Sequence, residues 1–221
     1  MTVIIVIWGY PIVRRGVWNS LRLSFVGATL AIVLVTLASY VIYRSRIKGR
    51  GFLSFVTAIP IAVPGLVLAM GILRVYINAP PPINYVYGTV WILMLAYVTR
   101  FLPFGMGAVS SVLLTLEPEL DECSRVCGAS WLKTMMKITV PLLKPGLVCG
   151  WLVLFIIFIR ELGVSILLYG RESEVMSVAL FLIYDTEPME LTAAFAIIQT
   201  AMLLALVYVF KKVVGMGELS F

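Results

Sequence analysis

The chain has 221 residues, of which 62% are hydrophobic and only 13% are charged, and its mean hydropathy is +1.06. A soluble domain cannot cover its surface with so few polar residues, so the composition excludes soluble classes and predicts an all-α, polytopic helical membrane protein. The net charge of +6 is attributed to basic loops, not to nucleic-acid binding. The absence of histidine removes the commonest general base and metal ligand. We expect no catalytic residue, no metal site and no cofactor.

Residues 1–20 are expected to form an N-terminal apolar stub and external segment. The apolar run Val3–Val13 is too short to span a membrane alone, and it lacks the basic start and the cleavage site of a secretory signal. It is interpreted either as the end of a preceding span or as an interfacial segment. The first interpretation makes the chain a part of a longer polypeptide.

Five apolar runs reach the roughly 20 residues that a membrane-spanning helix needs. They cover Leu21–Tyr43, Phe52–Ile77, Tyr85–Met106, Gly146–Leu168 and Leu191–Phe210. Together they predict a transmembrane domain over residues 21–211, with a long loop at 107–145 and a tail at 212–221. Most Lys and Arg residues gather in the loops at 44–50 and 117–144 and at the C-terminal end, which places that side in the cytoplasm.

The long loop is predicted to form two short helices. Pro118 suits the first turn of one helix, and the acidic residues around it favour its positive end. Gly128 can take the left-handed turn that ends this helix, and Ser130 can cap a second one. Pro141 and Pro145 are then expected to break the chain before the next span.

The three cysteines, Cys123, Cys127 and Cys149, lie on or near the predicted cytoplasmic side, where disulfides are rare. Cys123 and Cys127 share one helix face. We interpret them as small residues that pack, because two thiols alone are a weak metal signal.

Five residues within the spans are candidates for a translocation pathway. Pro60, Pro64 and Gly65 allow a kink in the second span, which either lines a cavity or is an ordinary proline kink. Arg160 and Glu161 are expected about two-thirds of the way across the fourth span, where charges are costly. They are either pathway residues or members of structural ion pairs, with snorkelling to the interface a further option for Arg160.

A motif in the long loop carries a family resemblance. Glu122, Gly128, Ile138 and Pro141 match the pattern E-A-A-x3-G-x9-I-x-L-P, in which Cys123 and Ser124 replace the two alanines and Val140 replaces leucine. This pattern resembles the EAA signature of the permease subunits of ATP-binding-cassette (ABC) importers. Five spans with the signature between the third and fourth are similar to the type I importer permease fold.

The resemblance implies that the loop docks onto an ATPase, with Glu122 as the anchor that pairs with a basic ATPase residue. The implied coupling residues are Glu119, Glu122, Cys123, Ser124, Gly128, Ala129, Ile138 and Pro141. The implied partners are two ABC ATPase subunits, a second permease half (an identical copy or a fused or paired domain) and an extracytoplasmic substrate-binding protein. The implied location is the plasma (inner) membrane of a bacterium or archaeon. The chain has no G-x-x-x-x-G-K-[ST] phosphate loop, so a separate partner would hydrolyse ATP.

The stretches Pro60–Leu68 and Arg160–Tyr169 resemble the ferric-iron branch of these permeases. Because the sequence has a single signature, it resembles one half, the second, of a permease chain that carries two such halves. The expected substrate is ferric iron or an iron chelate, with thiamine, polyamines and phosphonates as alternatives. A secondary transporter or channel is the alternative mechanism. It would need a coupling-ion site, for which the spans offer only Arg160, Glu161 and Arg100.

Overall fold

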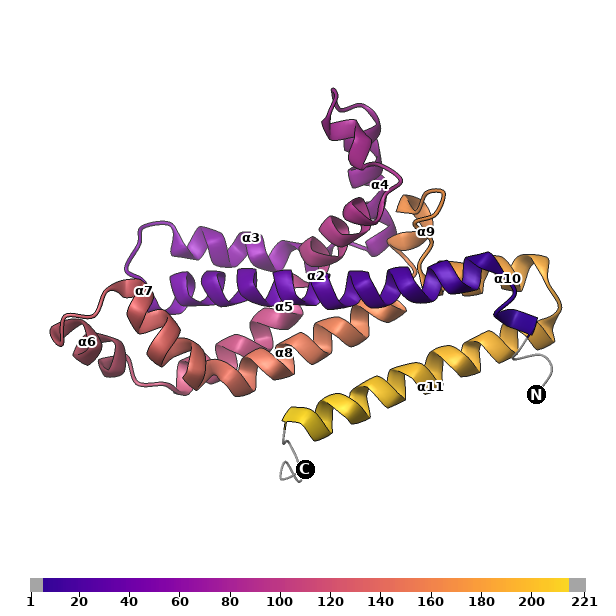
Figure 1. The fold of residues 1–221 in the computed structure, drawn as a ribbon. Helices are drawn as coiled ribbons and strands as arrows, with labels where there is room; N and C mark the ends of the chain where they lie inside the picture. Colours follow the sequence, from indigo (N-terminus) through magenta and orange to yellow (C-terminus); the bar gives the residue numbers. More distant parts are fainter. Residues whose placement is uncertain (1–5, 215–221) are drawn as a thin grey trace. The chain divides into compact units, whose positions relative to one another are not determined.

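The computed structural model describes residues 6–214, and over this range the chain forms helices and no strand (Figure 1). Among the described residues, four helices are long and apolar enough to cross a membrane. A fifth crossing results if α3 and α4 form one broken span. The prediction of an all-α polytopic membrane protein is therefore confirmed.

The elements follow one another along the chain with short connections. They are α2 (Pro11–Arg44), α3 (Arg50–Ala62), α4 (Gly65–Ile77), η1 (Ile83–Val86), α5 (Val90–Thr115), α6 (Glu119–Val126), α7 (Trp131–Thr134), η2 (Met135–Thr139), α8 (Val140–Arg160), α9 (Ser165–Leu168), α10 (Met176–Thr186) and α11 (Met189–Val214). They form two compact units. Unit 1 comprises the described residues up to 27, residues 64–97 and residues 155–214, and unit 2 comprises residues 28–63 and 98–154.

The first membrane helix begins earlier than its apolar run. Helix α2 begins at Pro11, not at Leu21, so residues 11–20 continue into the first span as one helix, and their external position stays a prediction; residues 1–5 lie outside the described part. Proline fits the first turn of a helix, where its missing N–H has no partner to lose. The charge of Arg15 is compatible with this helix because its Nε lies 3.2 Å from Oε2 of Glu174, a nearly buried carboxylate in unit 1.

The second span is interrupted, as the glycine and prolines predict, but the break lies after Pro60. Pro60 is accommodated inside α3. Val63 has extended backbone and Pro64 precedes the first residue of α4, Gly65. The residue before a proline is disfavoured in helical conformation, which explains why the helix stops at Val63.

The expected chain break at Pro141 and Pro145 is wrong. The helix runs without interruption over Trp131–Arg160, and Pro145 lies inside α8. The turn before Pro141 is a π-helix, in which the N–H of Val140 donates to the carbonyl of Met135. This wider turn accommodates a proline that has no N–H of its own to donate.

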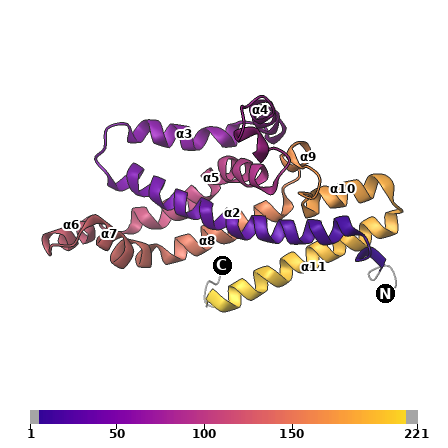
Figure 2. The same cartoon turned by 45° about the horizontal axis from the view of Figure 1, so that its top comes forward.

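Unit 2 is held together by close helix packing (Figure 2). A Cβ at Gly146 of α8 would lie 3.0 Å from the backbone oxygen of Ala108 of α5, and one at Gly150 would lie 2.8 Å from Ile32 of α2. Such small residues let membrane helices approach each other closely. One buried apolar cluster of this unit consists of Val35, Ile42, Met106, Val109, Leu113 and Leu143.

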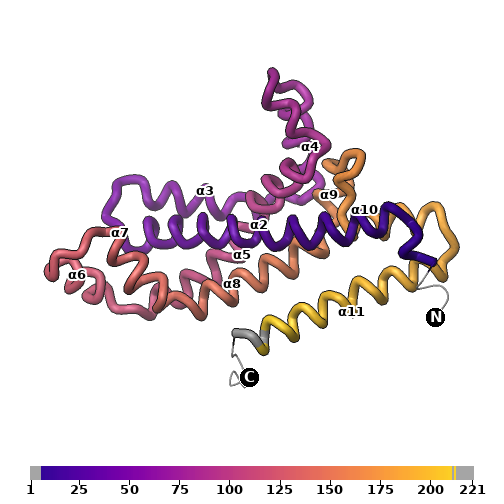
Figure 3. Tube along the Cα trace, viewed as in Figure 1, coloured from indigo at the N-terminus to yellow at the C-terminus, as the bar shows by residue number. Residues whose placement is uncertain are grey.

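Unit 1 packs α10 against α11 and against the start of α2 (Figure 3). One buried apolar cluster of this unit consists of Ile7, Val13, Met176, Ala179, Ile183, Ala194 and Phe195. Gly16 allows the close approach, because a Cβ there would lie 3.0 Å from the Cβ of Ala179. Asn19 reinforces the contact by donating to the backbone oxygens of Glu172 and Glu174, each at 2.9 Å.

Candidate functional site

The loop between α5 and α8 contains a short helix with a defined end. Helix α6 covers Glu119–Val126, and Gly128 follows it with a left-handed φ of 80°. The N–H of Gly128 donates to the carbonyl of Arg125 at 2.9 Å, and that of Ala129 donates to the carbonyl of Ser124 at 3.1 Å. This pair of bonds is the Schellman motif, and it fits the predicted role of Gly128.

Helices α6 and α7 are joined by two hydroxyl groups. The Oγ of Ser124 lies 2.9 Å from Oγ1 of Thr134, and both side chains are buried. Ser130 caps α7 by accepting a hydrogen bond from the N–H of Lys133, as its position predicts. The signature position Ser124 is therefore buried against α7 and has a packing role within the loop.

Tyr40 of α2 connects the loop to the rest of unit 2. Its hydroxyl donates to Oδ2 of Asp121 at 3.3 Å and accepts from Nη2 of Arg125 at 3.2 Å. The other carboxylate oxygen of Asp121 accepts from Thr139 at 3.0 Å. The ring of Trp131 meets the Tyr40 ring edge-on, with centroids 5.9 Å apart. These contacts hold α6 and η2 against the end of α2.

Arg44 of α2 contacts the start of the loop, at the C-terminal end of α5. Its Nη2 donates to the carbonyl of Leu113 at 2.9 Å and to that of Leu116. Both carbonyls lie at the C-terminal end of α5, where a cation is favourable. Beside it lies a cavity of about 620 Å³, lined by Tyr40, Tyr43, Arg44, Ser45, Arg46, Ile47, Arg50, Pro118, Asp121, Glu122, Arg125 and Trp131.

The outer face of the loop carries two carboxylates and apolar side chains. Glu119 and Glu122 are exposed, and Glu122 has only a long contact of 3.9 Å to Arg46. The flanking apolar residues Val126, Leu132 and Met136 are 88%, 63% and 61% exposed. Large apolar residues exposed beside charges are typical of a surface that a partner covers.

The other predicted coupling residues differ in how exposed their side chains are. Cys123 and Cys127 are exposed, so they do not pack within this chain, and their interpretation as small residues that pack stays a prediction. Gly128 and Pro141 are also exposed. Ala129 and Ile138 are half-buried. The sequence interpretation missed Tyr40, Asp121 and Arg44. Asp121 was visible as a charge in the loop, but nothing in an apolar run marks Tyr40 as a contact to a loop 81 residues away.

The fourth span ends at Arg160, which corrects the prediction that Arg160 and Glu161 lie within a helix continuing to Leu168. The backbone carbonyl of Glu161 no longer has a helical partner. It accepts hydrogen bonds from Tyr97 at 3.1 Å, Ser165 at 2.8 Å and Ser177 at 2.7 Å. Irregular backbone within a membrane must be satisfied in this way or line a cavity.

The carboxylate of Glu161 is engaged locally. Its Oε1 accepts a hydrogen bond of 2.9 Å from the N–H of Val164, at the start of α9. Helix α9 packs against α4, the helix that begins with Pro64 and Gly65. Four of the five pathway candidates, Pro64, Gly65, Arg160 and Glu161, belong to unit 1, and Pro60 belongs to unit 2.

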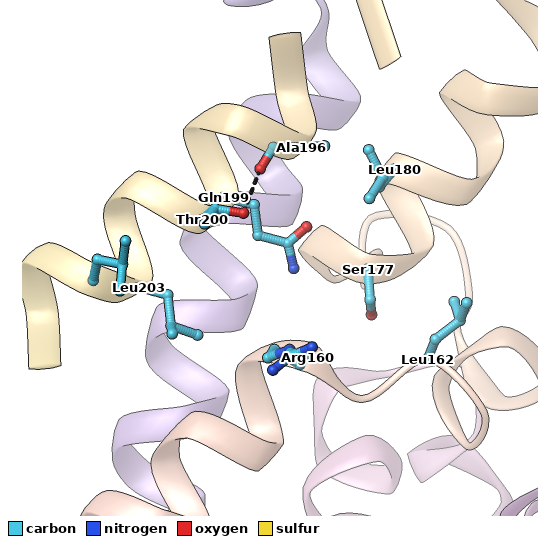
Figure 4. A pocket seen from close by; sticks show the side chains of 9 residues that line it. Arg160, Leu162, Ser177, Leu180, Ala196, Gln199, Thr200 and Leu203 are labelled. Atoms are coloured by element: carbon cyan, nitrogen blue, oxygen red, sulfur yellow. Dashed lines mark hydrogen bonds between the residues drawn. The ribbon is translucent and has the colours of Figure 1, made fainter. Parts of the chain in front are cut away.

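A cavity of about 510 Å³ with a mainly apolar lining and a few polar groups opens beside this break (Figure 4). It is lined by Arg160, Leu162, Ser177, Leu180, Ala196, Gln199, Thr200, Leu203 and Leu204. Gln199 reaches from α11 toward the space bordered by Arg160 and Ser177. Among residues 6–214, no group of three or more Cys, Asp or Glu side chains comes together as metal ligands.

A membrane helix that ends beside a cavity, a second pair of helices with a break, and a structured charged loop between two spans are features found in helical membrane transport proteins. The chain is more closely assigned by comparison with known families. Residues 35–215 match the family described as "Binding-protein-dependent transport system inner membrane component". The chain belongs to this family, which confirms its interpretation as a transport subunit of the ABC importer class and not an enzyme.

Relatives of the chain transport different substrates. It is 29% identical over 189 residues to the spermidine/putrescine transport system permease protein PotC of Haemophilus influenzae, covering 86% of this chain and 72% of PotC. It is 28% identical over 204 residues to the ferric transport system permease protein FbpB of Actinobacillus pleuropneumoniae, covering 90% of this chain but only 29% of FbpB.

The fold is also similar to that of a solved bacterial ABC transporter involved in the import of the acidic polysaccharide alginate. The TM-score is 0.77 at 17% identity, and the match covers 99% of this chain and 84% of the transporter chain. At this identity the likeness concerns the fold alone.

Proposed function

We propose that this chain forms part of the translocation pathway of an ATP-driven importer and is coupled to a cytoplasmic ABC ATPase through α6. The observation that carries the proposal is the outer face of α6, where Glu119 and Glu122 lie exposed beside Val126. This face is held rigidly, because Asp121 and Ser124 fix α6 from its inner side.

The coupling follows from this arrangement. An ATPase that binds the outer face of α6 displaces the helix when it closes on ATP. The Tyr40 hydroxyl and the Asp121 carboxylate transmit this displacement to α2, and Thr139 transmits it to the start of α8. A flexible loop would absorb the same displacement without moving a span.

The partners and the orientation are part of the same proposal. The loop of α6 and the C-terminal end face the cytoplasm of a bacterial or archaeal cell, across the plasma (inner) membrane. The family description names a binding protein, and an extracytoplasmic protein of that kind would deliver the substrate. A second permease half, identical or different, completes the pathway, and two ATPase subunits bind below.

The proposed substrate is ferric iron, carried as an iron chelate. The likeness to the ferric permease FbpB extends over 90% of this chain. The likeness to PotC makes a polyamine the second candidate. Arg160 weighs against the polyamine, because a guanidinium facing the cavity repels a polycation.

Uptake into proteoliposomes tests the proposal. The complex is purified through a tag on this chain, together with the proteins that remain bound, and is supplied with ⁵⁵Fe-labelled ferric citrate or labelled spermidine. We expect ATP-dependent uptake of the iron label. Uptake that proceeds without ATP and follows an ion gradient would contradict the ATPase coupling. ATP-dependent uptake of spermidine alone would contradict the iron substrate.

A matched pair of variants isolates the loop. Glu122→Lys reverses a charge on the exposed face, and Lys133→Glu reverses a charge on α7. The first is expected to abolish ATP-dependent uptake and ATPase co-purification while the chain still inserts into the membrane. The second is expected to have a smaller effect. Normal coupling in inserted Glu122→Lys would exclude this face as the docking surface.

A further inference from the structure

From the length of α11, we expect the cavity beside Arg160 to lie at membrane depth. Gln199 follows the start of α11 by about ten residues, or roughly 15 Å of helix, which is half of the hydrocarbon thickness. Arg160 lines the same cavity and therefore lies at a similar depth. An arginine at this depth is rare and faces water or a partner, because the lipid interior disfavours its charge.

The cavity offers hydrogen-bond donors without matching acceptors. Within residues 6–214, the guanidinium of Arg160 has no hydrogen-bond or ion-pair partner, and neither has the amide of Gln199. The hydroxyl of Ser177 donates to the carbonyl of Glu161 at 2.7 Å, and that of Thr200 donates to the carbonyl of Ala196 at 2.9 Å. No Asp or Glu side chain lines the space.

We propose that this cavity is an anion-binding station on the translocation route, with Arg160 and Gln199 as its recognition groups. A guanidinium binds carboxylate and phosphate oxygens through paired N–H groups, and the amide adds a further donor. The volume of about 510 Å³ lies within the range of small-ligand sites. The hydroxyls of Ser177 and Thr200 already donate to backbone carbonyls, which leaves recognition to Arg160 and Gln199, and the leucines bound the space.

The ligand class follows from this chemistry. It is a small solute that carries carboxylate or phosphate groups, and an iron chelate of a polycarboxylate belongs to it. The inference rests on the proposed importer function for the statement that the cavity lies on a transport route. A carboxylate from a second permease half that pairs with Arg160 is the competing occupant, and the experiment separates the two.

Equilibrium binding tests the proposal without ATP. The permease–ATPase complex is placed in lipid nanodiscs without its binding protein, and binding of ⁵⁵Fe-labelled ferric citrate is measured. We expect unlabelled citrate and inorganic phosphate to compete and spermidine not to compete. Arg160→Gln and Gln199→Leu are each expected to weaken binding, the first by about tenfold or more. Arg74→Gln, an exposed arginine of α4 outside the cavity, is the matched control and is expected to bind as the wild type does.

Three results would overturn the proposal. The first is wild-type affinity for ferric citrate in both cavity variants. The second is a wild-type complex that binds neither citrate nor phosphate. The third is an Arg160→Gln complex that falls apart while Gln199→Leu binds normally, since Arg160 would then pair with the second permease half. A wild-type complex that binds the chelate but does not import it with ATP would contradict the proposed function and not the anion site.

Discussion

Asp121 and Glu122 are adjacent carboxylates of α6 with different surroundings. Asp121 accepts hydrogen bonds from Tyr40 and Thr139, whereas the Glu122 side chain is 67% exposed and lies 3.9 Å from an exposed Arg46. An exposed ion pair of this length contributes little to stability. The first carboxylate therefore fixes the loop, and the second is available to a partner.

Separate effects on stability and coupling are expected from these two residues. Asp121→Asn removes the charge from two hydrogen bonds and is expected to lower the stability of the purified complex by about 1–2 kcal/mol. Glu122→Gln is expected to leave the melting temperature unchanged and to reduce uptake per ATP hydrolysed. Thermal unfolding and coupled uptake are measured on the same preparations. An equal loss of stability in both variants would contradict this division.

Gly128 is required by its backbone conformation and not by lack of space. Its φ is 80°, and no atom lies within 4 Å of the position where a Cβ would stand. Gly128→Ala is therefore expected to destabilise the loop by about 1–2 kcal/mol, and Gly128→Asn by less, because asparagine tolerates the left-handed region better. Hydrogen exchange of the α6 amides measures the effect. Equal protection in all three proteins would mean that the loop does not depend on this turn.

The sequence predicted those parts of the loop that rest on local chemistry. The turn at Gly128, the cap at Ser130 and a helix in the acidic segment follow from the preferences of a few neighbouring residues. The contact between Tyr40 and Asp121 joins residues far apart in the chain, and no local pattern encodes it. The exposure of Cys123 was missed for a similar reason, because the sequence does not say which face of α6 turns inward.

At the scale of elements, α8 packs closely through two glycines, Gly146 and Gly150, which differ in how easily the surrounding atoms could make room for an added Cβ. A Cβ at Gly146 would meet the backbone oxygen of Ala108 at 3.0 Å and Val112 at 2.9 Å, and backbone cannot easily move away. At Gly150 the nearest atom, at 2.8 Å, is the end of the flexible Ile32 side chain. The two glycines lie about one helical turn apart on α8, and both approach Ala108 of α5.

Gly146→Ala is accordingly expected to be more destabilising than Gly150→Ala, by about 1–3 kcal/mol for the first. Gly107→Ala in α5 is the control, because no atom lies within 4 Å of its added Cβ, and we expect no loss there. The melting temperature of the complex in detergent measures all three. A ranking in which Gly107→Ala is the most damaging would contradict this account of the packing.

Helix ends were harder to predict from the sequence than helix existence. The sequence predicted chain breaks at Pro141 and Pro145. The π-helical turn at 135–139 instead accommodates Pro141 near the start of α8, and Pro145 lies inside α8. The real end at Arg160 has no proline beside it. It is stabilised by Tyr97, Ser165 and Ser177, which satisfy the freed carbonyl of Glu161 from other elements. Such support depends on the tertiary fold.

At the scale of the whole molecule, α11 is the least covered of the four described helices that are each long enough to cross a membrane. Only 11% of its most apolar stretch is buried, and Ile197, Leu204 and Tyr208 are more than 60% exposed. It also carries Gln199 and Thr200 on the cavity. A helix with polar groups at membrane depth is expected to face a protein partner or water and not only lipid.

We therefore expect this chain to act only in a complex with two permease halves and two ATPase subunits. One α6 offers one ATPase contact, and α11 needs a partner to enclose its polar residues. The mass of the purified complex in nanodiscs, measured by light scattering, is expected to correspond to this four-part assembly. Ile197→Trp on the exposed side of α11 is expected to reduce assembly, with Phe52→Trp, an exposed apolar position on α3, as the control. A single copy of this chain that transports substrate without any ATPase would contradict both the assembly and the docking role of α6.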